Sequence, residues 1–389
     1  MTRRFALAAL ATFTFTALVA TAAQPAAAQT NGYTVTDLGL LSGATASFAK
    51  AVNDTGSVVG YATIPNGPNA EVYKGWLWTP STPNAPSGTL RPLEPLAGRV
   101  NSFPRDINNA GLIVGNSVTY NSGQRHAGTF WQGPDYAPVD FNSLPRDPAL
   151  AGWEFGSAVS VSDPAAVTGE IYVAGYGYYV AADGSTVESS IVWRVDAAGV
   201  IVGVTTLSGS PALGLRGDMN NRGQVTSSLK SAVGSDAFLW DGLGGTGTNL
   251  GTLGGTSAYG RGINEYGTVV GDSSTTAGTT RGFVWTPAVP NGTQGTMVAL
   301  GTLSGTSSFA YGINDLNQIV GYAYLKGNRI IHATLWQNGA TTPTDLNTLK
   351  KAGATGLELL EAYRINNRGG IIGRYSTNKG NRAFLLTPR

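Results

Sequence analysis

The stretch "YGINDLNQIVGYAY", from Tyr311 to Tyr324, repeats a pattern found fifty residues earlier in "RGINEYGTVVGDSS", from Arg261. Each copy predicts two β-strands joined by a tight turn. Asn or Asp at the start of a turn can hydrogen-bond to the backbone ahead, and Gly tolerates a positive φ. In both copies the turn Asn precedes a Gly by seven residues. The number of such copies therefore decides the fold.

The Asn–Gly spacing recurs along the chain. The intact pairs are Asn53–Gly60, Asn108–Gly115, Asn264–Gly271, Asn314–Gly321 and Asn366–Gly373, and two copies with one substitution are Ser162–Gly169 and Asn220–Ser227. After each hairpin a short strand ends in an apolar residue, at Trp78, Trp131, Trp193, Trp240, Trp285, Trp336 and Leu386. An apolar pair three residues apart, such as Leu300 and Leu303, also recurs seven times. The chain therefore contains seven units, spaced by 44 to 58 residues.

Two of these units resemble a known family. The segments "LGTLGGTSAYGRGINEYGTVVG" and "LGTLSGTSSFAYGINDLNQIVG" are similar to the repeat pattern of the HAF-repeat family, a group of probable extracellular proteins. The resemblance is close around residues 248 to 340 and weak around residues 139 to 202. It implies export and a β-repeat fold, and it implies no catalytic residues.

Each unit predicts four strands, such as "SFAYGIN", "QIVGYAY", "HATLW" and "TPTDLNTL". Four-stranded units at this spacing are typical of β-propeller blades. The last unit lacks a fourth strand, whereas "YTVTDLGLL" near the amino end is a fourth strand without a unit. We therefore predict an all-β, seven-bladed β-propeller of four-stranded antiparallel blades, closed by pairing of residues 33–41 with residues 383–388, which would remove two open sheet edges. An open β-solenoid is the alternative architecture, and the weak third unit leaves six blades as an alternative count.

The first strand of each unit alternates bulky and small side chains. Tyr259, Arg261 and Ile263 are bulky, whereas Gly260 and Gly262 between them are bare. Because alternate residues face opposite sides of a strand, the bulky face of one blade is expected to meet the bare face of the next. The exceptions are expected near an end of the channel or paired with one another, and they are Pro104, Asp106, Arg216, Asp218 and Arg364.

The first 28 residues are predicted to be a secretory signal peptide. Arg3 and Arg4 precede an apolar stretch that ends in small residues at Ala26–Ala28. We expect a single β-propeller domain over residues 29–389 that is secreted to the extracellular space or the periplasm; a membrane anchor is the alternative. Removing two of the 25 basic residues leaves 23, equal to the 23 acidic residues. This balance argues against nucleic acid or an anionic membrane as partner, and no later segment is apolar enough to span a bilayer.

Five candidate ligand-binding residues lie three positions before the turn residue of their units: Lys50, Arg105, Arg261, Tyr311 and Tyr363. Near the channel they would offer cations and phenols to a carboxylate or a sugar-like ligand. Packing of the tyrosines between blades and exposure of the basic groups is the alternative. These residues are expected on the variable-loop face, which carries the loops between second and third strands. The segment Tyr172–Tyr179 is either a carbohydrate or protein contact or a decorated hairpin.

Signals for catalysis are weak. The chain has two histidines, and His332 occupies a repeat position of the family pattern, which favours a structural role over that of a catalyst. The absence of Cys and of histidine metal motifs predicts no metal and no cofactor. The glutamates that a glycosidase would need as a facing pair are scattered, at Glu154, Glu170, Glu188, Glu358 and Glu361.

The sequence favours an exported, monomeric, non-enzymatic scaffold that binds a saccharide, a cell-envelope component or a protein through its variable-loop face. No catalytic residue is assigned. The alternative is an extracellular polysaccharide lyase or glycoside hydrolase with its site in the propeller funnel. A solvent-open cluster of His126 or His332 with Arg and Tyr side chains would favour the enzyme, and an apolar plug would favour the scaffold.

Overall fold

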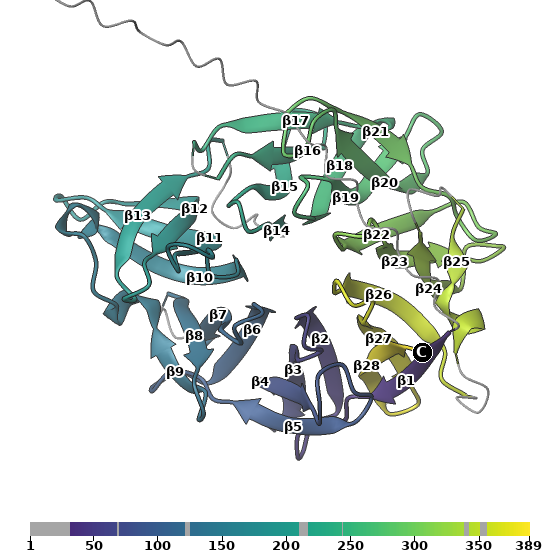
Figure 1. The fold of residues 1–389 in the computed structure, drawn as a ribbon, viewed down its shortest axis with the longest axis horizontal. Helices are drawn as coiled ribbons and strands as arrows, with labels where there is room; N and C mark the ends of the chain where they lie inside the picture. The colour runs from purple at the N-terminus through teal and green to yellow at the C-terminus, as the bar shows by residue number, and fades with distance from the viewer. Residues whose placement is uncertain are drawn as a thin grey trace, which may run out of the picture.

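The computed structural model describes residues 32–67, 70–120, 125–209, 217–242, 244–337, 342–350 and 356–389. The predicted signal peptide and Arg216 lie outside these residues. Small antiparallel sheets follow one another around a ring with their first strands innermost (Figure 1). Within the described part, no helix combines the length and apolar character required to cross a membrane.

The ring consists of four-strand units in chain order. Unit 1 contains β2 (Ala46–Val52), β3 (Val58–Pro65), β4 (Glu71–Pro80) and β5 (Gly88–Leu93). Unit 2 contains β6 (Asn101–Ile107), β7 (Ile113–Val118), β8 (Ala127–Gln132) and β9 (Ala137–Asp140), and is followed by the short helices η1 (Phe141–Ser143) and η2 (Pro148–Leu150). Unit 3 contains β10 (Trp153–Val161), β11 (Ile171–Val180), β12 (Thr186–Val195) and β13 (Ile201–Thr206). Unit 4 contains β14 (Asp218–Met219), β15 (Val225–Lys230), β16 (Ser235–Trp240) and β17 (Gly247–Gly251).

The remaining units complete the ring. Unit 5 contains β18 (Gly254–Ile263), β19 (Val269–Thr275), β20 (Thr280–Pro287) and β21 (Gly295–Ala299). Unit 6 contains β22 (Ser308–Ile313), β23 (Ile319–Tyr324), β24 (Ile331–Trp336) and β25 (Thr344–Asp345), followed by η3 (Leu346–Leu349). Unit 7 contains β26 (Leu359–Ile365), β27 (Ile371–Thr377), β28 (Gly380–Pro388) and, from the other end of the chain, β1 (Tyr33–Asp37).

Five of these units are separate four-stranded sheets, and units 4 and 5 share one eight-stranded sheet. A single parallel residue pair, Ser235 with Ser257, joins the two halves of that larger sheet. The fourth strand of unit 6 is shorter than predicted. The Asp345 carboxylate accepts a hydrogen bond from the Asn347 backbone at 2.8 Å, which caps η3 and ends the strand after two residues.

The two ends of the described chain pair with each other. Tyr33 lies opposite Pro388 and Asp37 opposite Phe384 in an antiparallel ladder, and the Leu38 N–H donates to the Ala383 carbonyl at 3.0 Å. Tyr33 is fully buried in the cluster that covers unit 7. The predicted pairing of the amino-terminal strand with the last unit is therefore confirmed.

The core lies between neighbouring units. Trp76, Trp131, Trp193, Trp240 and Trp336, near the ends of third strands, are almost completely buried. One cluster joins Val59 and Leu77 of unit 1 to Ile107, Ile113 and Trp131 of unit 2. Small first-strand residues such as Ala310 are also fully buried, packed with residues of the preceding unit. Each unit is therefore stabilised by burial of apolar surface against the next.

A β-bulge interrupts the first strand in six units. In unit 6, Ala310 pairs with Gly321 and Gly312 with Val320, so Tyr311 is the extra residue. The bulge brings the Phe309 carbonyl oxygen to 1.9 Å from where a Cβ on Gly321 would lie. Only glycine fits at that position, which explains why the repeat keeps it.

Unit 3 departs from the predicted register. The sequence paired Ser162 with Gly169, but Gly175 is the glycine that lies opposite the bulge of this unit. The turn is longer here, because Ser162 N–H donates to the Tyr172 carbonyl at 3.0 Å. The assignment of Gly169 was therefore wrong, and the cause is an insertion in the turn.

Candidate functional site

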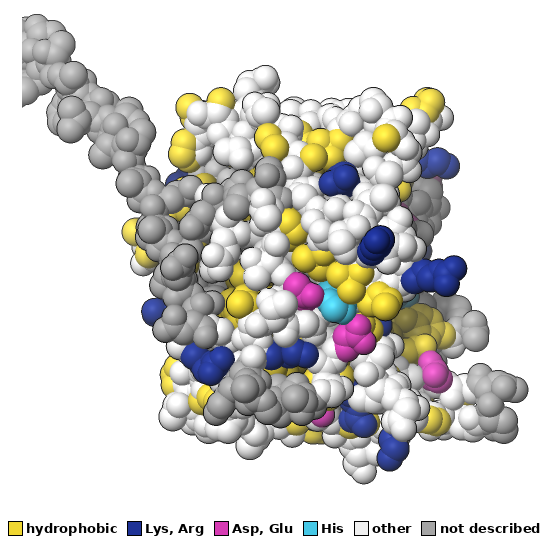
Figure 2. Space-filling model, turned by 90° about the vertical axis from the view of Figure 1, so that its right-hand side faces the viewer, with side chains coloured by type: hydrophobic (Ala, Val, Ile, Leu, Met, Phe, Trp, Pro, Cys, Tyr) yellow, Lys and Arg dark blue, Asp and Glu magenta, His cyan; other side chains and the backbone are white. Residues whose placement is uncertain are grey.

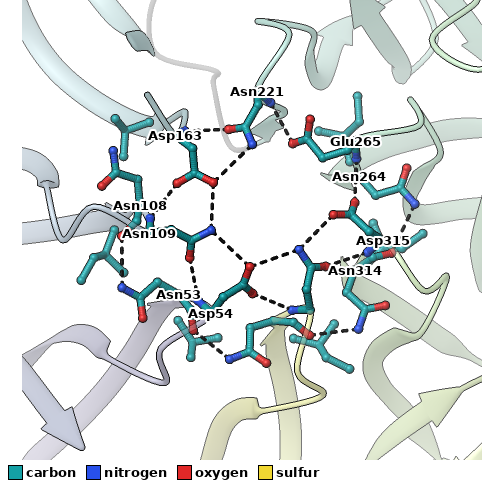
Figure 3. A pocket seen from close by; sticks show the side chains of 18 residues that line it. Asn53, Asp54, Asn108, Asn109, Asp163, Asn221, Asn264, Glu265, Asn314 and Asp315 are labelled. Carbon is teal, nitrogen blue, oxygen red and sulfur yellow. Dashed lines mark hydrogen bonds between the residues drawn. The ribbon is translucent and has the colours of Figure 1, made fainter. Parts of the chain in front are cut away.

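The turns between first and second strands meet around the axis at one end of the ring (Figure 3). Asn366 shows the pattern. Its Oδ1 accepts hydrogen bonds from Arg368 N at 3.1 Å and Gly370 N at 2.7 Å, and its Nδ2 donates to the Asn53 carbonyl of the next unit at 2.8 Å. The predicted turn-forming role is confirmed, and the amide additionally ties adjacent units together.

The same inter-unit bond is made by six turn asparagines, at 2.8 to 3.2 Å: Asn53, Asn108, Asn220, Asn264, Asn314 and Asn366. Ser162 fills this position in unit 3 and has no amide to donate. An aspartate would form the turn equally well but could not donate while ionised. All six turn positions carry Asn and none carries Asp. That preference was the feature of the sequence that could have predicted this contact.

The residues that follow form a second ring, here called the polar ring: Asp54, Asn109, Asp163, Asn221, Glu265, Asp315 and Asn367. Each backbone N–H donates to a side-chain oxygen of the next member, and Asn367 donates to Asp54, at distances of 2.6 to 2.9 Å. The dashed lines in Figure 3 follow much of this circuit. The cycle of seven hydrogen bonds closes on itself.

Carboxylates and amides alternate around the polar ring, which separates like charges. Asn109 Nδ2, for example, donates to Asp54 at 3.1 Å and to Asp163 at 2.8 Å. Seven is odd, so alternation must fail once, and it fails where Glu265 is followed by Asp315. Burial raises the pKa of Glu265 to about 7, and the Asp315 carboxylate contributes to the rise. Burial likewise raises the pKa of Asp315.

The polar ring surrounds a recess of about 170 Å³. Its lining includes β-branched residues from six first strands: Val52, Ile107, Val161, Ile263, Ile313 and Ile365. Among the described residues, no group of three His, Asp or Glu side chains is placed to hold a metal ion. Because the side chains of the polar ring hydrogen-bond mainly to one another, they hold neighbouring units together at this end of the ring.

Farther along the channel, three of the predicted exceptions to the small-residue pattern form a polar network. Asp106 Oδ2 accepts hydrogen bonds from Ser160 Oγ at 2.8 Å and from Val161 N at 2.9 Å. Arg364 Nη2 lies 3.7 Å from Asp218 Oδ2. Burial, and then the Asp218 charge, raises the pKa of Asp106 well above its usual range. Asp218 and Arg364 thus pair with each other, which is one of the two arrangements expected for these exceptions.

The five predicted binding residues are all bulged residues of first strands: Lys50, Arg105, Arg261, Tyr311 and Tyr363. A bulge re-aims its extra side chain, which gives these positions a common structural origin that sequence spacing alone did not show. They are described below in two groups, one in units 5 to 7 and one in units 1 to 3.

The network of units 5 to 7 is internally paired. Arg261 Nε donates to Asp272 at 2.8 Å, and its guanidinium lies 5.6 Å from the Tyr311 ring centre. Tyr363 donates its hydroxyl to Glu361 at 2.5 Å. Glu361 also accepts two hydrogen bonds from Arg374, at 2.7 and 3.0 Å. The rings of Tyr311 and Tyr363 therefore pack between units, as the alternative interpretation expected. Arg261 instead pairs with a carboxylate of its own unit, whereas that interpretation expected exposed basic groups.

In units 1 to 3, two of the five residues are cations that lie against aromatic rings. Lys50 Nζ lies 5.2 Å from the Tyr61 ring centre, and the exposed Arg105 lies 5.3 Å from that of Phe103. Burial lowers the pKa of Lys50 to about 8, with the Arg105 and Arg364 charges adding to the effect and Glu361 opposing it. Lys50 and Arg105 thus place two cations over aromatic faces.

These two rings belong to a larger aromatic belt that crosses units 1 to 3. Neighbouring ring centres are 5.2 to 6.4 Å apart. Its members are Phe48, Tyr61, Tyr73, Phe103, Tyr120, His126, Tyr176 and Tyr178. Tyr120 is 51% exposed, so part of the belt faces solvent. The sequence singled out Tyr172–Tyr179 but did not connect it with units 1 and 2.

The two histidines have different surroundings. His126 Nδ1 lies 2.7 Å from the Tyr176 hydroxyl, within the aromatic belt. His332 bridges Asp345 at 2.6 Å and Glu358 at 2.9 Å. Burial opposes protonation of His332, but these two hydrogen bonds outweigh it and raise its pKa. His332 therefore links unit 6 to the segment before β26, as expected of a structural residue.

Three of the scattered glutamates form salt bridges with arginines. Glu154 pairs with Arg125 at 3.0 Å, Glu170 with Arg194 at 3.4 Å, and Glu361 with Arg374. On the face shown in Figure 2, basic and acidic side chains are scattered among uncharged ones and do not gather into one patch.

Comparison with known proteins identifies the fold. No family model matches the chain, so the HAF-repeat resemblance stays a prediction, and no curated protein matches it. The chain is similar to the β-propeller domain of the Trilobed protease from Pyrococcus furiosus, with a TM-score of 0.50 and 9% identity over 88% of this chain and 94% of that one. That domain has an open velcro topology, whereas here β1 completes unit 7.

Two further solved structures are similar at lower scores. Pyrococcus horikoshii acylaminoacyl peptidase has a TM-score of 0.48 and 11% identity; the match covers 87% of this chain but only 51% of the peptidase. The Dos1 propeller has a TM-score of 0.47 and 10% identity over 91% of this chain and 95% of that one. At such identities the comparisons establish the fold alone, and the fold is a β-propeller.

Proposed function

We propose that this chain is an exported, monomeric, seven-bladed β-propeller that binds an acidic saccharide on the variable-loop face of units 1 to 3. The blade count treats units 4 and 5 as separate blades, because one residue pair joins them. The closed cycle of seven hydrogen bonds in the polar ring supports the same count.

The observation behind the binding proposal is the placement of Lys50 and Arg105 on the aromatic belt. Flat aromatic side chains suit the apolar faces of sugar rings, while a few placed polar groups fix a ligand's orientation. Cations on the same surface select carboxylates, because charge-assisted hydrogen bonds are stronger than neutral ones. A cell-envelope component fits this proposal if it carries acidic sugars.

The site of units 5 to 7 is a weaker candidate. Its Arg261 and Arg374 already have carboxylate partners, in Asp272 and Glu361. An added carboxylate ligand would have to displace one of these partners. We assign the binding role to Lys50 and Arg105 because both lie over rings of the aromatic belt, and a packing role to Arg261, Tyr311 and Tyr363.

Binding of the exported chain to immobilised acidic and neutral polysaccharides tests the proposal. Lys50→Met and Arg105→Met remove charge while keeping the side-chain stem, and each is expected to weaken binding to acidic polymers about 10- to 100-fold. Arg329→Met, in an exposed loop of unit 6, is the charge-matched control and should leave binding unchanged. Unaltered affinity in Arg105→Met, preference for neutral polymers, or binding only to protein ligands would contradict the proposal.

A further inference from the structure

We infer that His126 and Tyr176 form the acid–base centre of a β-elimination that cleaves 4-linked uronate polysaccharides. The inference rests on the proposed binding of an acidic saccharide to the aromatic belt. It assigns an activity to two residues whose contact crosses from unit 2 to unit 3.

The pair lies where a bound saccharide would reach it. His126 precedes β8 and Tyr176 lies in β11, with His126 Nδ1 and the Tyr176 hydroxyl 2.7 Å apart. The His126 ring centre is 6.4 Å from Tyr120 and 6.2 Å from Tyr176, so it continues the belt. A sugar chain that stacks on the exposed Tyr120 would therefore extend toward the pair.

The surroundings favour the neutral form of both groups. Burial lowers the pKa of His126, with the Arg105 and Arg99 charges adding to the effect and Glu188 opposing it. Burial raises the pKa of Tyr176, with Tyr178 and Glu188 adding and Arg105 opposing. At neutral pH the imidazole is then available as a base and the phenol as an acid, which is the separation that acid–base catalysis requires.

The reaction balances within this pair and the substrate. With a hydrogen on Nδ1, His126 donates to the Tyr176 oxygen and keeps Nε2 as the base that removes the proton from C5. The electron pair forms the C4–C5 double bond, the C4–O bond breaks, and Tyr176 gives its proton to the leaving oxygen. The Tyr176 oxygen then recovers a proton from His126 Nδ1 across their contact, and exchange with solvent restores the starting tautomer.

Arg105 supplies the electrostatic part of the reaction. Removal of the C5 proton places additional negative charge on the neighbouring carboxylate, and a fixed cation stabilises that charge as it develops. The charge of Arg105 acts on both His126 and Tyr176, which places it in the same cluster. Arg105 is therefore the residue expected to hold the reacting carboxylate.

The short distance between base and acid also selects the substrate. His126 and Tyr176 lie side by side, with Nδ1 and the hydroxyl oxygen 2.7 Å apart, so the base at Nε2 and the acid at the hydroxyl approach a bound sugar ring from the same side. The hydrogen on C5 and the oxygen on C4 share a face in glucuronate and mannuronate, and they lie on opposite faces in galacturonate. The geometry therefore points to a syn elimination on glucuronate or mannuronate polymers, with polygalacturonate resistant.

The test measures cleavage and binding in parallel. The exported chain is incubated with glucuronan, polymannuronate and polygalacturonate; the ultraviolet absorbance of the new double bond reports cleavage, and calorimetry reports binding. We expect product from the first two polymers only. His126→Gln and Tyr176→Phe should each lower kcat at least 100-fold with affinity kept within threefold, which also shows that the variants fold. Tyr179→Phe, on the same hairpin, is the control and should retain activity.

Each outcome is informative. Binding without product in the unmodified chain, cleavage of polygalacturonate alone, or full activity in either variant would overturn the inference and leave the proposed binding intact. Loss of all binding would overturn both. A second readout is the rising limb of the kcat/KM profile, which should move to higher pH in Arg105→Met, because removal of a nearby positive charge raises the pKa of His126. If the rising part of the kcat/KM profile does not move in Arg105→Met, His126 is not the base.

Discussion

Asn366→Asp tests the tie between the last and first units. Asn366 is 4% exposed, and its Nδ2 donates to the Asn53 carbonyl at 2.8 Å. Aspartate keeps both turn hydrogen bonds accepted by Oδ1 but places an ionised oxygen against that carbonyl. An uncompensated buried charge costs about 3–5 kcal/mol. Asn366→Ser, which copies the residue that unit 3 carries in Ser162, leaves one acceptor unsatisfied and should cost about 1–3 kcal/mol.

Equilibrium urea unfolding followed by tryptophan fluorescence measures both free energies. Asn366→Asp is expected to have the lower free energy of unfolding of the two variants at pH 8. Its stability should rise as the pH falls, because a protonated aspartate can again donate a hydrogen bond to the Asn53 carbonyl. The denaturant slope should stay constant, since the fold is unchanged. The reasoning is refuted if the free energy of unfolding of Asn366→Asp at pH 8 lies within about 1 kcal/mol of that of the unmodified chain. It is also refuted if Asn366→Asp is no less stable than Asn366→Ser.

Three other predictions use the same assay. Gly321→Ala should cost about 3 kcal/mol or more, because the new Cβ would lie 1.9 Å from the Phe309 carbonyl oxygen; a neutral result would reject the bulge as the reason for glycine. Glu265 has a folded pKa raised from 4.5 to about 7, so its contribution to stability falls as pH rises through that interval. Glu265→Gln should raise the free energy of unfolding by about 1–2 kcal/mol at pH 8, after allowance for solvent screening, and leave it unchanged near pH 4. An equal increase at both pH values would contradict the raised pKa of Glu265. Arg261→Met should cost about 3–5 kcal/mol by stranding the buried Asp272, while folded protein keeps its saccharide affinity; the reverse pattern would make Arg261 a ligand contact.

The repeat made most of the fold predictable. Turn chemistry at Asn314 and the spacing to Gly321 are local signals, and the unmatched strands at the two ends indicated their pairing. The exceptions arose where local signals compete. Asp345 both ends a strand and caps η3, and the longer turn after Ser162 shifted the apparent register.

The five candidate binding residues share a position that the sequence shows, but the sequence did not show the different contacts that they make. Lys50 and Arg261 occupy the same place in their units, yet Arg261 forms a salt bridge with Asp272 of its own second strand, whereas Lys50 lies over the Tyr61 ring. That carboxylate interrupts the repeat pattern and carries no signal of its own. His126 and Tyr176 are fifty residues apart in different units, so their 2.7 Å contact depends on how neighbouring sheets pack.

The most direct test of the central claim is a crystal structure of this chain with a bound glucuronan oligosaccharide. We predict a uronate carboxylate within hydrogen-bonding distance of Lys50 or Arg105, with a sugar ring stacked on the exposed Tyr120. An oligosaccharide bound instead at the polar ring or beside Arg261, or no bound sugar at saturating concentration, would contradict the account.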